Sequence, residues 1–440
     1  MINEFINAAC VPLGTAHSSG SLTQAEAMLA ADPGLGQKSI YTAAILGDLA
    51  SVGKFLHDDP DNATEKGGPR DWDALTHLCF SRFLRQPPKD ACFVNTARAL
   101  LDAGANPNTG FYESSHQPTP CFESVLYGVA GIAHHEGLTR LLLERGADPN
   151  DGETPYHVAE GYDNGAFQAV FESGKLDANG VATLLLRKID FHDGKAINWL
   201  LEQGVGPNVI GQWGKSALQS AIVRGNGMPI IQALLDHGAD PMLPGKHGSA
   251  TDLAARYGRG DALASFKALG KIAELKGLDR LLAACARDDV DKIAEIIQLD
   301  PSLTSELLAT EGRVLVEFAG SGNTPGVSHL LELGVDVNAT DSAGDGYFGI
   351  ARNSTALHAA AWRARHQTVR LLIERGADLN LKDGQDRTAL MLAVKACVNS
   401  YWIEMRAPDS VAALLSAGAS VEGVQHPCGY EPVDNLLANT

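Results

Sequence analysis

The amino-acid sequence predicts an all-α fold, a solenoid of about 11–12 helix–turn–helix units with hairpin-like connecting loops. Three observations predict it. A Gly-Ala-Asp/Asn motif recurs along the chain after a Leu-Leu helix end, and its copies follow a recognisable period. Thr/Ser-x-Leu-His-like tetrapeptides mark the starts of first helices at Thr154, Ser216, Thr355 and Thr388. One such helix pair cannot bury its apolar face alone, so neighbouring pairs must stack into a continuous core.

The recurring glycine marks the end of the second helix of each unit. Its copies are Gly104, Gly146, Gly204, Gly238, Gly334, Gly376 and Gly418. Glycine just past the last helical turn can take the left-handed conformation that satisfies free carbonyl groups, and the Asp or Asn that follows favours a turn. We therefore expect a left-handed glycine at each of these positions.

The spacing of the motif gives the period. Gly204 and Gly238 are 34 residues apart (238 − 204), whereas Gly334 and Gly376 are 42 apart (376 − 334). A standard unit of this kind has about 33 residues. The longer spacing implies a loop or a helix extension inside some units.

The units are expected in the following order. Residues 1–36 form an N-terminal cap with one helix at Thr23–Ala31, residues 37–274 a first sub-array, residues 275–424 a second, and residues 425–440 a C-terminal cap helix. Asp-Pro follows a second helix at Asp32, Asp59 and Asp300. Because this pattern restarts in mid-chain, we expect the second sub-array to begin near Leu278.

The best-preserved unit shows both helices. Thr355 to His358 start its first helix, since Thr can cap a helix start. Val369, Leu372 and Ile373 lie at i, i+3 and i+4 of the second, which predicts one buried stripe.

This unit, with Gly376 to Asn380 after its second helix, resembles an ankyrin repeat, and degraded copies recur along almost the whole chain. The resemblance implies a surface that holds a partner and rarely a site of chemistry. It also implies a structural role for the tetrapeptide histidines, His77, His157 and His358, through bonds to neighbouring backbone and hydroxyl groups.

Three insertions interrupt the pattern, at residues 82–93, 341–353 and 397–407. In repeat proteins, insertions map to loops on one face, often the binding face. Together with the sequence around Trp72, they resemble a bacterial group of long, divergent ankyrin proteins.

A partner is expected along the concave surface, at the first-helix ends, the hairpin tips and the third insertion. Tryptophan, tyrosine and arginine dominate binding hot spots, and these positions carry several of them. The predicted partner-binding residues are Trp72, Tyr112, Trp213, Arg224, Arg256, Tyr257, Trp362, Arg363, Tyr401, Trp402 and Arg406. Their arginines suit a protein or peptide with an acidic segment. The alternative for each aromatic is packing within its own unit.

A second function remains open, a small-molecule binding protein or enzyme with a pocket between the inserted loops near Trp362, Trp402 and Arg406. The sequence has neither Gly-x-Ser-x-Gly nor Gly-x-x-x-x-Gly-Lys-Ser/Thr. We expect no enzyme activity, no catalytic residue, no cofactor and no metal site. An effector or toxin-neutralising role is a third possibility and is still a binding role.

Composition narrows the class of partner. The net charge of −18 should repel nucleic acid and anionic membranes. No stretch approaches 18 uninterrupted apolar residues, and the first residues lack a basic secretory leader. The seven cysteines are scattered without Cys-x-x-Cys, as in a reducing cytoplasm. We expect a cytoplasmic monomer.

Overall fold

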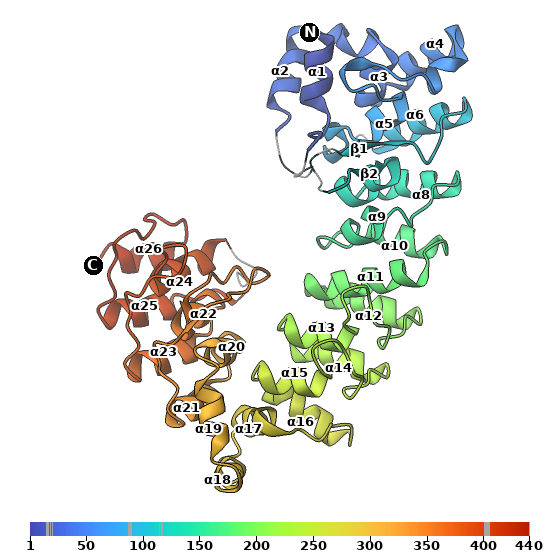
Figure 1. The fold of residues 1–440 in the computed structure, drawn as a ribbon. Coiled ribbons are helices and arrows are strands. Elements are labelled where there is room, and N and C mark those ends of the chain that lie inside the picture. The colour runs from blue at the N-terminus through green and yellow to red at the C-terminus, as the bar shows by residue number, and fades with distance from the viewer. Residues whose placement is uncertain are drawn as a thin grey trace. The chain divides into compact units, whose positions relative to one another are not determined.

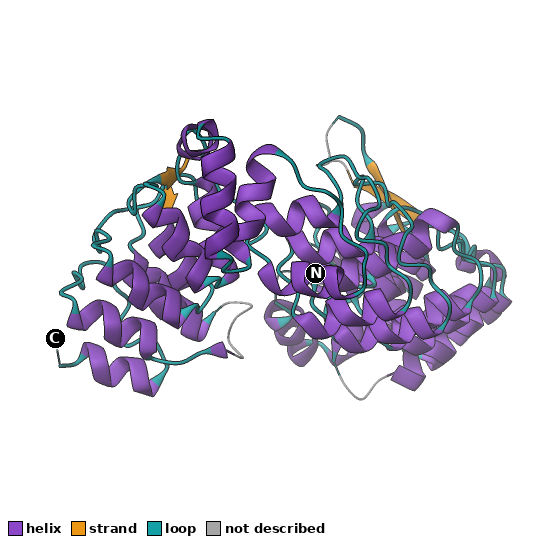
Figure 2. Ribbon diagram, turned by 90° about the horizontal axis from the view of Figure 1, so that it is seen from below, coloured by secondary structure: helices purple, strands orange, loops and turns teal. Residues whose placement is uncertain are grey.

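The computed structural model describes residues 1–14, 17, 19, 21–86, 90–113, 115, 118–399 and 405–439 of the 440-residue chain. The described chain is built mainly from helices and turns, and its named strands form two short antiparallel ribbons (Figure 2). It divides into two compact units. Unit 1 is Met1–Val205 with Gly211–Trp213, and unit 2 is Gly206–Ile210 with Gly214–Thr440.

The predicted helix stops are confirmed. All seven motif glycines have a positive φ, from 82° at Gly376 to 101° at Gly104. In this left-handed region a residue with a Cβ is disfavoured, which explains why glycine follows the second helix of unit after unit.

The predicted helix starts hold with one exception. Ser216 and Thr388 cap α13 (Ala217–Val223) and α24 (Ala389–Val398), each accepting a bond from the backbone N–H three residues on. Thr355 is the N-cap of α22 (Ala356–Trp362). The exception is Thr154, which lies inside α9 (Glu153–His157) while Asp151 accepts its backbone N–H at 2.7 Å.

Unit 1 stacks helix pairs, and its consecutive first helices pack on one another. Two helices precede the pairs, α1 (Ile2–Ala9) and α2 (Thr23–Ala31); α2 lies where a helix is predicted, whereas α1 has no counterpart in the predicted cap. The first helices are α3 (Ile40–Leu46), α5 (Ala74–Cys79), α7 (Val125–Tyr127), α9 and α11 (Ala178–Asp190). The second helices are α4 (Leu49–Asp58), α6 (Asp90–Asp102), α8 (Glu136–Glu144), α10 (Gly165–Glu172) and α12 (Gly194–Glu202).

Short turns and one ribbon complete unit 1. The 3-10 turns are η1 (Pro33–Gln37), η2 (Pro60–Ala63), η3 (Gly68–Arg70) and η4 (Arg82–Arg85), and α7 runs into the π turn η5 (Gly128–Ile132). Strand β1 (Gly110–Glu113) pairs with β2 (Cys121–Ser124), with Gly110 opposite Ser124.

Unit 2 continues the same pattern of helix pairs. Its first helices are α13, α15 (Ala250–Arg256), α17 (Gly277–Ala286), α20 (Arg313–Ser321), α22 and α24. Its second helices are α14 (Met228–Asp236), α16 (Gly260–Ala268), α18 (Val290–Leu299), α21 (Thr324–Glu332), α23 (His366–Glu374) and α25 (Asp409–Ser416). The remaining elements are α19 (Ser302–Leu308), the ribbon β3 (Thr340–Asp341) with β4 (Ser354–Thr355), and α26 (Glu431–Leu437), which packs on α25.

Unit 2 bends sharply at α17–α19 (Figure 1). Helix α20 packs on α15 as well as on its neighbour α22. At the bend, the side-chain amide of Asn323 donates to the backbone carbonyls of Gly258 at 2.8 Å and Ala286 at 2.7 Å. One side chain therefore joins the ends of α15 and α17 to the start of α21.

The predicted apolar stripe of α23 is buried at Val369 and Leu372 and half-buried at Ile373. The predicted boundary between sub-arrays, 274/275, falls inside unit 2 between α16 and α17. The four predicted divisions of the chain remain predictions.

Candidate partner-binding surfaces

In unit 1, the β1–β2 ribbon carries aromatic side chains on its outer face. Tyr112 is 70% exposed, and its ring centroid lies 5.2 Å from that of Phe122 on the opposite strand. Side chains alternate across a strand, so Phe111 and Glu113 point the other way and are buried. Tyr112 is accessible at a hairpin, and its role in binding stays a prediction.

A second aromatic group lies at the first-helix face of unit 1. Trp213 is 42% exposed, and its ring centroid lies 6.1 Å from that of Tyr156 in α9. The guanidinium of Arg187, from α11, lies 3.9 Å from the Tyr156 ring centre. We call Tyr156, Arg187 and Trp213, with the ion pairs beside them, the open face of unit 1.

The ion pairs of the open face form a chain. His157 lies 3.1 Å from Glu153 and 3.3 Å from Glu160, and Arg187 lies 2.7 Å from both Glu160 and Asp190. Burial lowers the pKa of His157, but hydrogen bonds to Glu153 and Glu160 outweigh it and raise that pKa to about 9. His157 was expected to bond backbone and hydroxyl groups. It bonds two carboxylates instead, because Glu153 lies one turn before it in α9 and Glu160 lies just after the helix end.

Two buried carboxyl groups lie behind this face. Glu113 and Glu123, one from each strand of the ribbon, are both buried. Burial, then the charges of Glu153 and Glu113, raises the pKa of Glu123 to about 8. Among the described residues, no hydrogen-bond donor reaches its Oε2; the His17 Nδ1 atom lies 3.9 Å away. No sequence motif identifies Glu113 and Glu123 as buried, because their burial depends on how residues 110–124 pair and alternate as strands.

Trp72 is also in unit 1 but is 4% exposed. Its ring stacks on Phe111 with centroids 4.4 Å apart, and the Arg70 guanidinium lies 4.8 Å from its centre. This burial argues against direct contact with a partner and matches packing within its own unit.

In unit 2, the first-helix ends are covered by residues 341–353, which we call the inserted loop. The Arg224 guanidinium lies 3.8 Å from the ring centre of Tyr347, and that of Arg363 lies 3.9 Å from the ring centre of Phe348. Phe348 and Arg363 are both buried, with Arg363 4% exposed. A Cβ added at Gly225 would clash with the Arg363 guanidinium, so α13 and α22 meet closely here.

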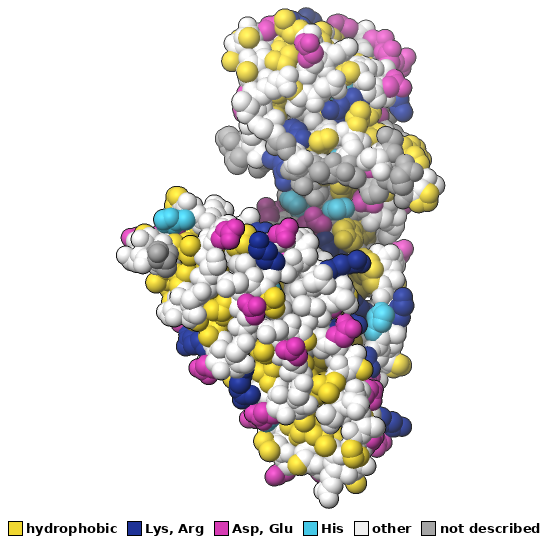
Figure 3. Space-filling view, turned by 60° about the vertical axis from the view of Figure 1, so that its left-hand side comes forward, with side chains coloured by type: hydrophobic (Ala, Val, Ile, Leu, Met, Phe, Trp, Pro, Cys, Tyr) yellow, Lys and Arg dark blue, Asp and Glu magenta, His cyan; other side chains and the backbone are white. Residues whose placement is uncertain are grey.

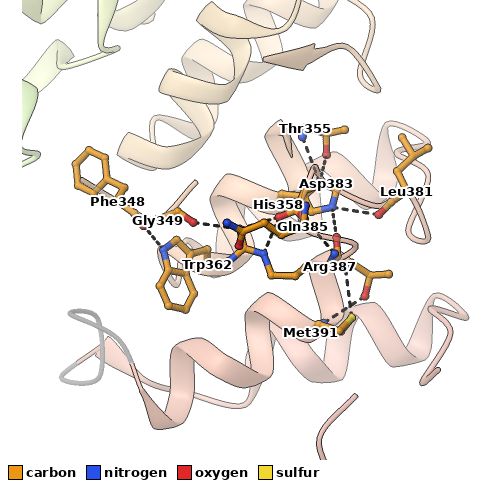
Figure 4. Close-up of polar contacts among 11 residues, drawn as sticks. Phe348, Gly349, Thr355, His358, Trp362, Leu381, Asp383, Gln385, Arg387 and Met391 are labelled. Carbon is orange, nitrogen blue, oxygen red and sulfur yellow. Dashed lines mark hydrogen bonds and ion pairs between the residues drawn. The ribbon is translucent and has the colours of Figure 1, made fainter. Parts of the chain in front are cut away.

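The inserted loop is held by two side chains of the array (Figure 4). The indole N–H of Trp362 donates to the carbonyl of Phe348, and Arg387 donates to the carbonyl of Gly349 at 3.1 Å. Trp362 is 7% exposed. Trp362 and Arg363 were predicted to touch a partner, but both are buried against the chain's own loop.

Charged and polar groups lie beneath the loop. Burial, reinforced by Asp345, raises the pKa of Glu317 to about 7 although Arg363 and Arg313 oppose it. Burial lowers the pKa of Arg363 to about 9. Burial, with Glu317 and Asp345, raises the pKa of Tyr257 to about 12. The structure thus brings four predicted residues to one covered surface: Arg224, Tyr257, Trp362 and Arg363.

The other predicted residues of unit 2 lie apart from this surface or outside the described residues. Arg256 is exposed and pairs with both carboxylate oxygens of Asp279, at 2.8 and 2.6 Å. Arg406 is exposed, with its guanidinium 4.7 Å from the ring centre of Tyr430. Tyr401 and Trp402 lie outside the described residues.

The tetrapeptide histidines His77 and His358 are buried and bonded as the resemblance implies. His358 bonds the Thr355 hydroxyl at 2.8 Å and the carbonyls of Leu381 and Arg387 at 3.1 and 3.0 Å (Figure 4). His77 Nδ1 lies 2.9 Å from the carbonyl of Asp73, and burial lowers its pKa to about 4.

Two cavities of unit 2 bear on the small-molecule alternative. One of about 970 Å³ is lined by residues of α16, α17, α18 and α21, and one of about 520 Å³ by residues of α23, α25 and α26. Neither is lined by Trp362 or Arg406. Within the described ranges, no group of three or more His, Cys, Asp or Glu side chains is placed to hold a metal ion. No helix in that part of the chain has the length and apolar character needed to cross a bilayer.

Comparison with known proteins identifies a recognisable repeat in part of unit 2. The family model "Ankyrin repeats (3 copies)" matches residues 315–423. No curated protein matches the sequence. Among solved structures, the crystal structure of the ankyrin repeat domain of Bcl-3, described as a unique member of the IκB protein family, matches at 21% identity over 52% of this chain and 97% of that chain, with a TM-score of 0.24. Residues 315–423 contain ankyrin repeats, and the predicted all-α ankyrin-repeat solenoid is confirmed as the fold class.

Proposed function

We propose that the chain is a non-catalytic protein-interaction scaffold that holds a protein or peptide on the open face of unit 1 and the outer face of its β1–β2 ribbon. Ankyrin repeats are generally protein–protein interaction modules, and stacked repeats create extended binding surfaces. The observation that carries the proposal is the exposure of Tyr112 and Trp213, because exposed aromatic side chains are the usual anchors of protein interfaces.

The charges beside the open face favour a partner segment that contains basic residues. Glu153, Glu160 and Asp190 supply three negative charges beside Tyr156, against the positive charges of Arg187 and protonated His157 that pair with them, so the group keeps one net negative charge. In unit 2, Arg224, Arg256 and Arg363 are engaged with Tyr347, Asp279 and Phe348. The acidic segment expected from the arginines therefore has less support than a basic one.

The distribution of charge over the wider surface does not by itself indicate which partner binds. Acidic and basic side chains are interspersed among the described residues visible in Figure 3, although the net charge is −18. Specificity is thus expected from the aromatic anchors together with nearby carboxylates. We also propose that the protein is a bacterial, cytoplasmic monomer, which fits the seven cysteines, none of which forms a disulfide.

The test is affinity capture from a lysate of the source organism with quantitative mass spectrometry. The bait is wild-type protein or the double variant Tyr112→Ala/Trp213→Ala, and Arg256→Ala serves as an exposed control in unit 2. We expect a protein whose recovery falls at least about tenfold with the double variant, as for loss of hot-spot anchors, and is unchanged with the control. Purified partner must then bind with the same ranking. Equal recovery of every captured protein by all three baits would refute the proposal.

A further inference from the structure

The inserted loop of unit 2 covers a surface that has the chemistry of a binding site. We propose that this surface, made by Arg224, Tyr257, Glu317, Trp362 and Arg363, binds peptides and is occupied in the resting protein by the inserted loop. Its external partner is a segment with an acidic residue followed within three positions by two adjacent aromatic residues. This second interaction surface is separate from the open face of unit 1.

The loop sits on the surface as a ligand would. Two aromatic side chains in succession each meet one arginine, Tyr347 beneath Arg224 and Phe348 beneath Arg363, at 3.8 and 3.9 Å. A guanidinium over an aromatic ring is attractive, and more so when water is excluded. The two arginines directly follow α13 and α22, helices far apart in the sequence, so the surface spans several repeats.

The loop is a self-contained turn rather than a strand of the array. Asp345 and Ile350 exchange two backbone hydrogen bonds of 2.9 Å each, and the Asp345 carboxylate accepts the backbone N–H of Tyr347 at 2.8 Å. The same carboxylate oxygen lies 3.3 Å from the N–H of Phe348. This preformed turn presents the aromatic pair, and a partner segment with the same order of side chains can present it equally.

The floor under the loop combines apolar and charged groups. Phe348 and Ile350 of the loop pack with Val316, Ala359 and Trp362 in one apolar cluster. Beside this cluster lie Glu317 and Arg363, both strongly shifted in pKa by burial. Burying charged groups is expensive, and apolar replacements are often at least as stable. A surface that only needed packing would not require them, whereas a surface that recognises a segment does.

The loop is joined to the array by a small number of hydrogen bonds. Beyond its apolar contacts, its carbonyls accept bonds from the Trp362 and Arg387 side chains and, at Arg352, from the backbone N–H of Gly384 at 2.7 Å. A tethered segment has an effective concentration in the millimolar range for short linkers, so the loop outcompetes the same sequence supplied from outside. Covering the surface thus lowers its apparent affinity for any external segment.

The test uses a fluorescein-labelled synthetic peptide of residues 341–353 and full-length protein, with binding read by fluorescence anisotropy. The variant Tyr347→Ala/Phe348→Ala empties the surface. We expect it to bind the peptide at least about tenfold more tightly than wild type does. A peptide carrying Phe348→Ala should lose this binding, and so should the original peptide when Arg363→Ala is added to the protein variant.

A milder variant guards against misfolding. Tyr347→Ala alone keeps Phe348 and every residue of the surface and removes one loop contact, so it should raise peptide affinity in the same direction by a smaller factor. Circular dichroism establishes that each variant is folded. Equal affinity for wild type and every folded variant, or no binding by any folded variant, would overturn the proposal. Neither result bears on Tyr112 and Trp213, so the function proposed for unit 1 stands or fails separately.

Discussion

The surface formed by the first helices is partly exposed to solvent in unit 1 and covered by a loop in unit 2. In unit 1, the first-helix face leaves Tyr156 and Trp213 partly open to solvent, edged by carboxylates. In unit 2, the corresponding helix ends lie under the inserted loop, which places Tyr347 and Phe348 against two arginines. A solenoid therefore does not make every stretch of its inner face available, and one 13-residue insertion can remove a stretch from solvent.

The largest expected effect tests whether Phe348 of the inserted loop is buried while Tyr112 of the ribbon is exposed. Phe348→Ala should lower the free energy of unfolding by about 3–5 kcal/mol, since it truncates a buried phenylalanine. Tyr112→Ala, on the exposed ribbon, should change it by less than about 0.5 kcal/mol. Urea unfolding followed by circular dichroism measures both. Similar losses for the two variants would end the distinction between an open and a covered face.

The buried carboxyl of unit 1 predicts a pH-dependent difference. The folded-state pKa of Glu123 is raised from 4.5 to about 8, so the wild type loses stability as pH rises through that window. Glu123→Gln cannot titrate, and it should match wild type near pH 5 but exceed it near pH 9 by about 2–4 kcal/mol. The control is the exposed Glu144→Gln. A constant difference between wild type and Glu123→Gln from pH 5 to 9 would contradict the assignment.

A smaller effect tests the anchor of the inserted loop. Trp362→Phe keeps an aromatic ring but removes the donor to the Phe348 carbonyl. Leaving a buried carbonyl unsatisfied should cost about 1–3 kcal/mol. The matched change in unit 1, Trp213→Phe, should cost less than about 0.5 kcal/mol. Thermal unfolding compares them, and no excess loss for Trp362→Phe would show that the hydrogen bond does not hold the loop.

The smallest effect concerns an arginine of unit 2 that the loop does not cover. Arg256→Ala removes an ion pair with Asp279 that is open to solvent on the arginine side. It should cost about 0.2–1 kcal/mol at low ionic strength and less in about 1 M salt, because salt screens such pairs. Melting temperatures at the two salt concentrations check this. A loss above that range, or one that salt does not reduce, would mean that Arg256 has a buried structural role.

The sequence predicts the local features of the fold well because each depends on a few neighbouring residues. The left-handed glycines, the helix starts at Ser216 and Thr388 and the burial of Leu372 follow from propensity and period. Position along a helix also identified Trp362 and Arg363 as helix-end residues. It could not show that the inserted loop folds back onto them, because that contact depends on where a long connection runs in space.

The burial of Trp72 and the burial of Glu113 and Glu123 were not predicted, for the same physical reason. Trp72 carries an interface-type side chain but stacks on Phe111, a residue of a ribbon that begins 38 positions later (110 − 72). Glutamates are mostly exposed in folded proteins, yet the pleat of a short ribbon buries both Glu113 and Glu123. In each case the partner that decides exposure comes from another element.

The amide of Asn323 has a consequence for how the protein folds. Repeats that touch only their neighbours can form and melt one after another from either end. Asn323 ties the ends of α15 and α17 to the start of α21, and α20 packs directly on α15, so these repeats share contacts across 65 residues of sequence. None of these repeats can unfold without breaking hydrogen bonds or packing contacts of the others. The segment from α15 to α21 should therefore exchange its backbone amides with solvent as one cooperative block, while the terminal repeats open independently.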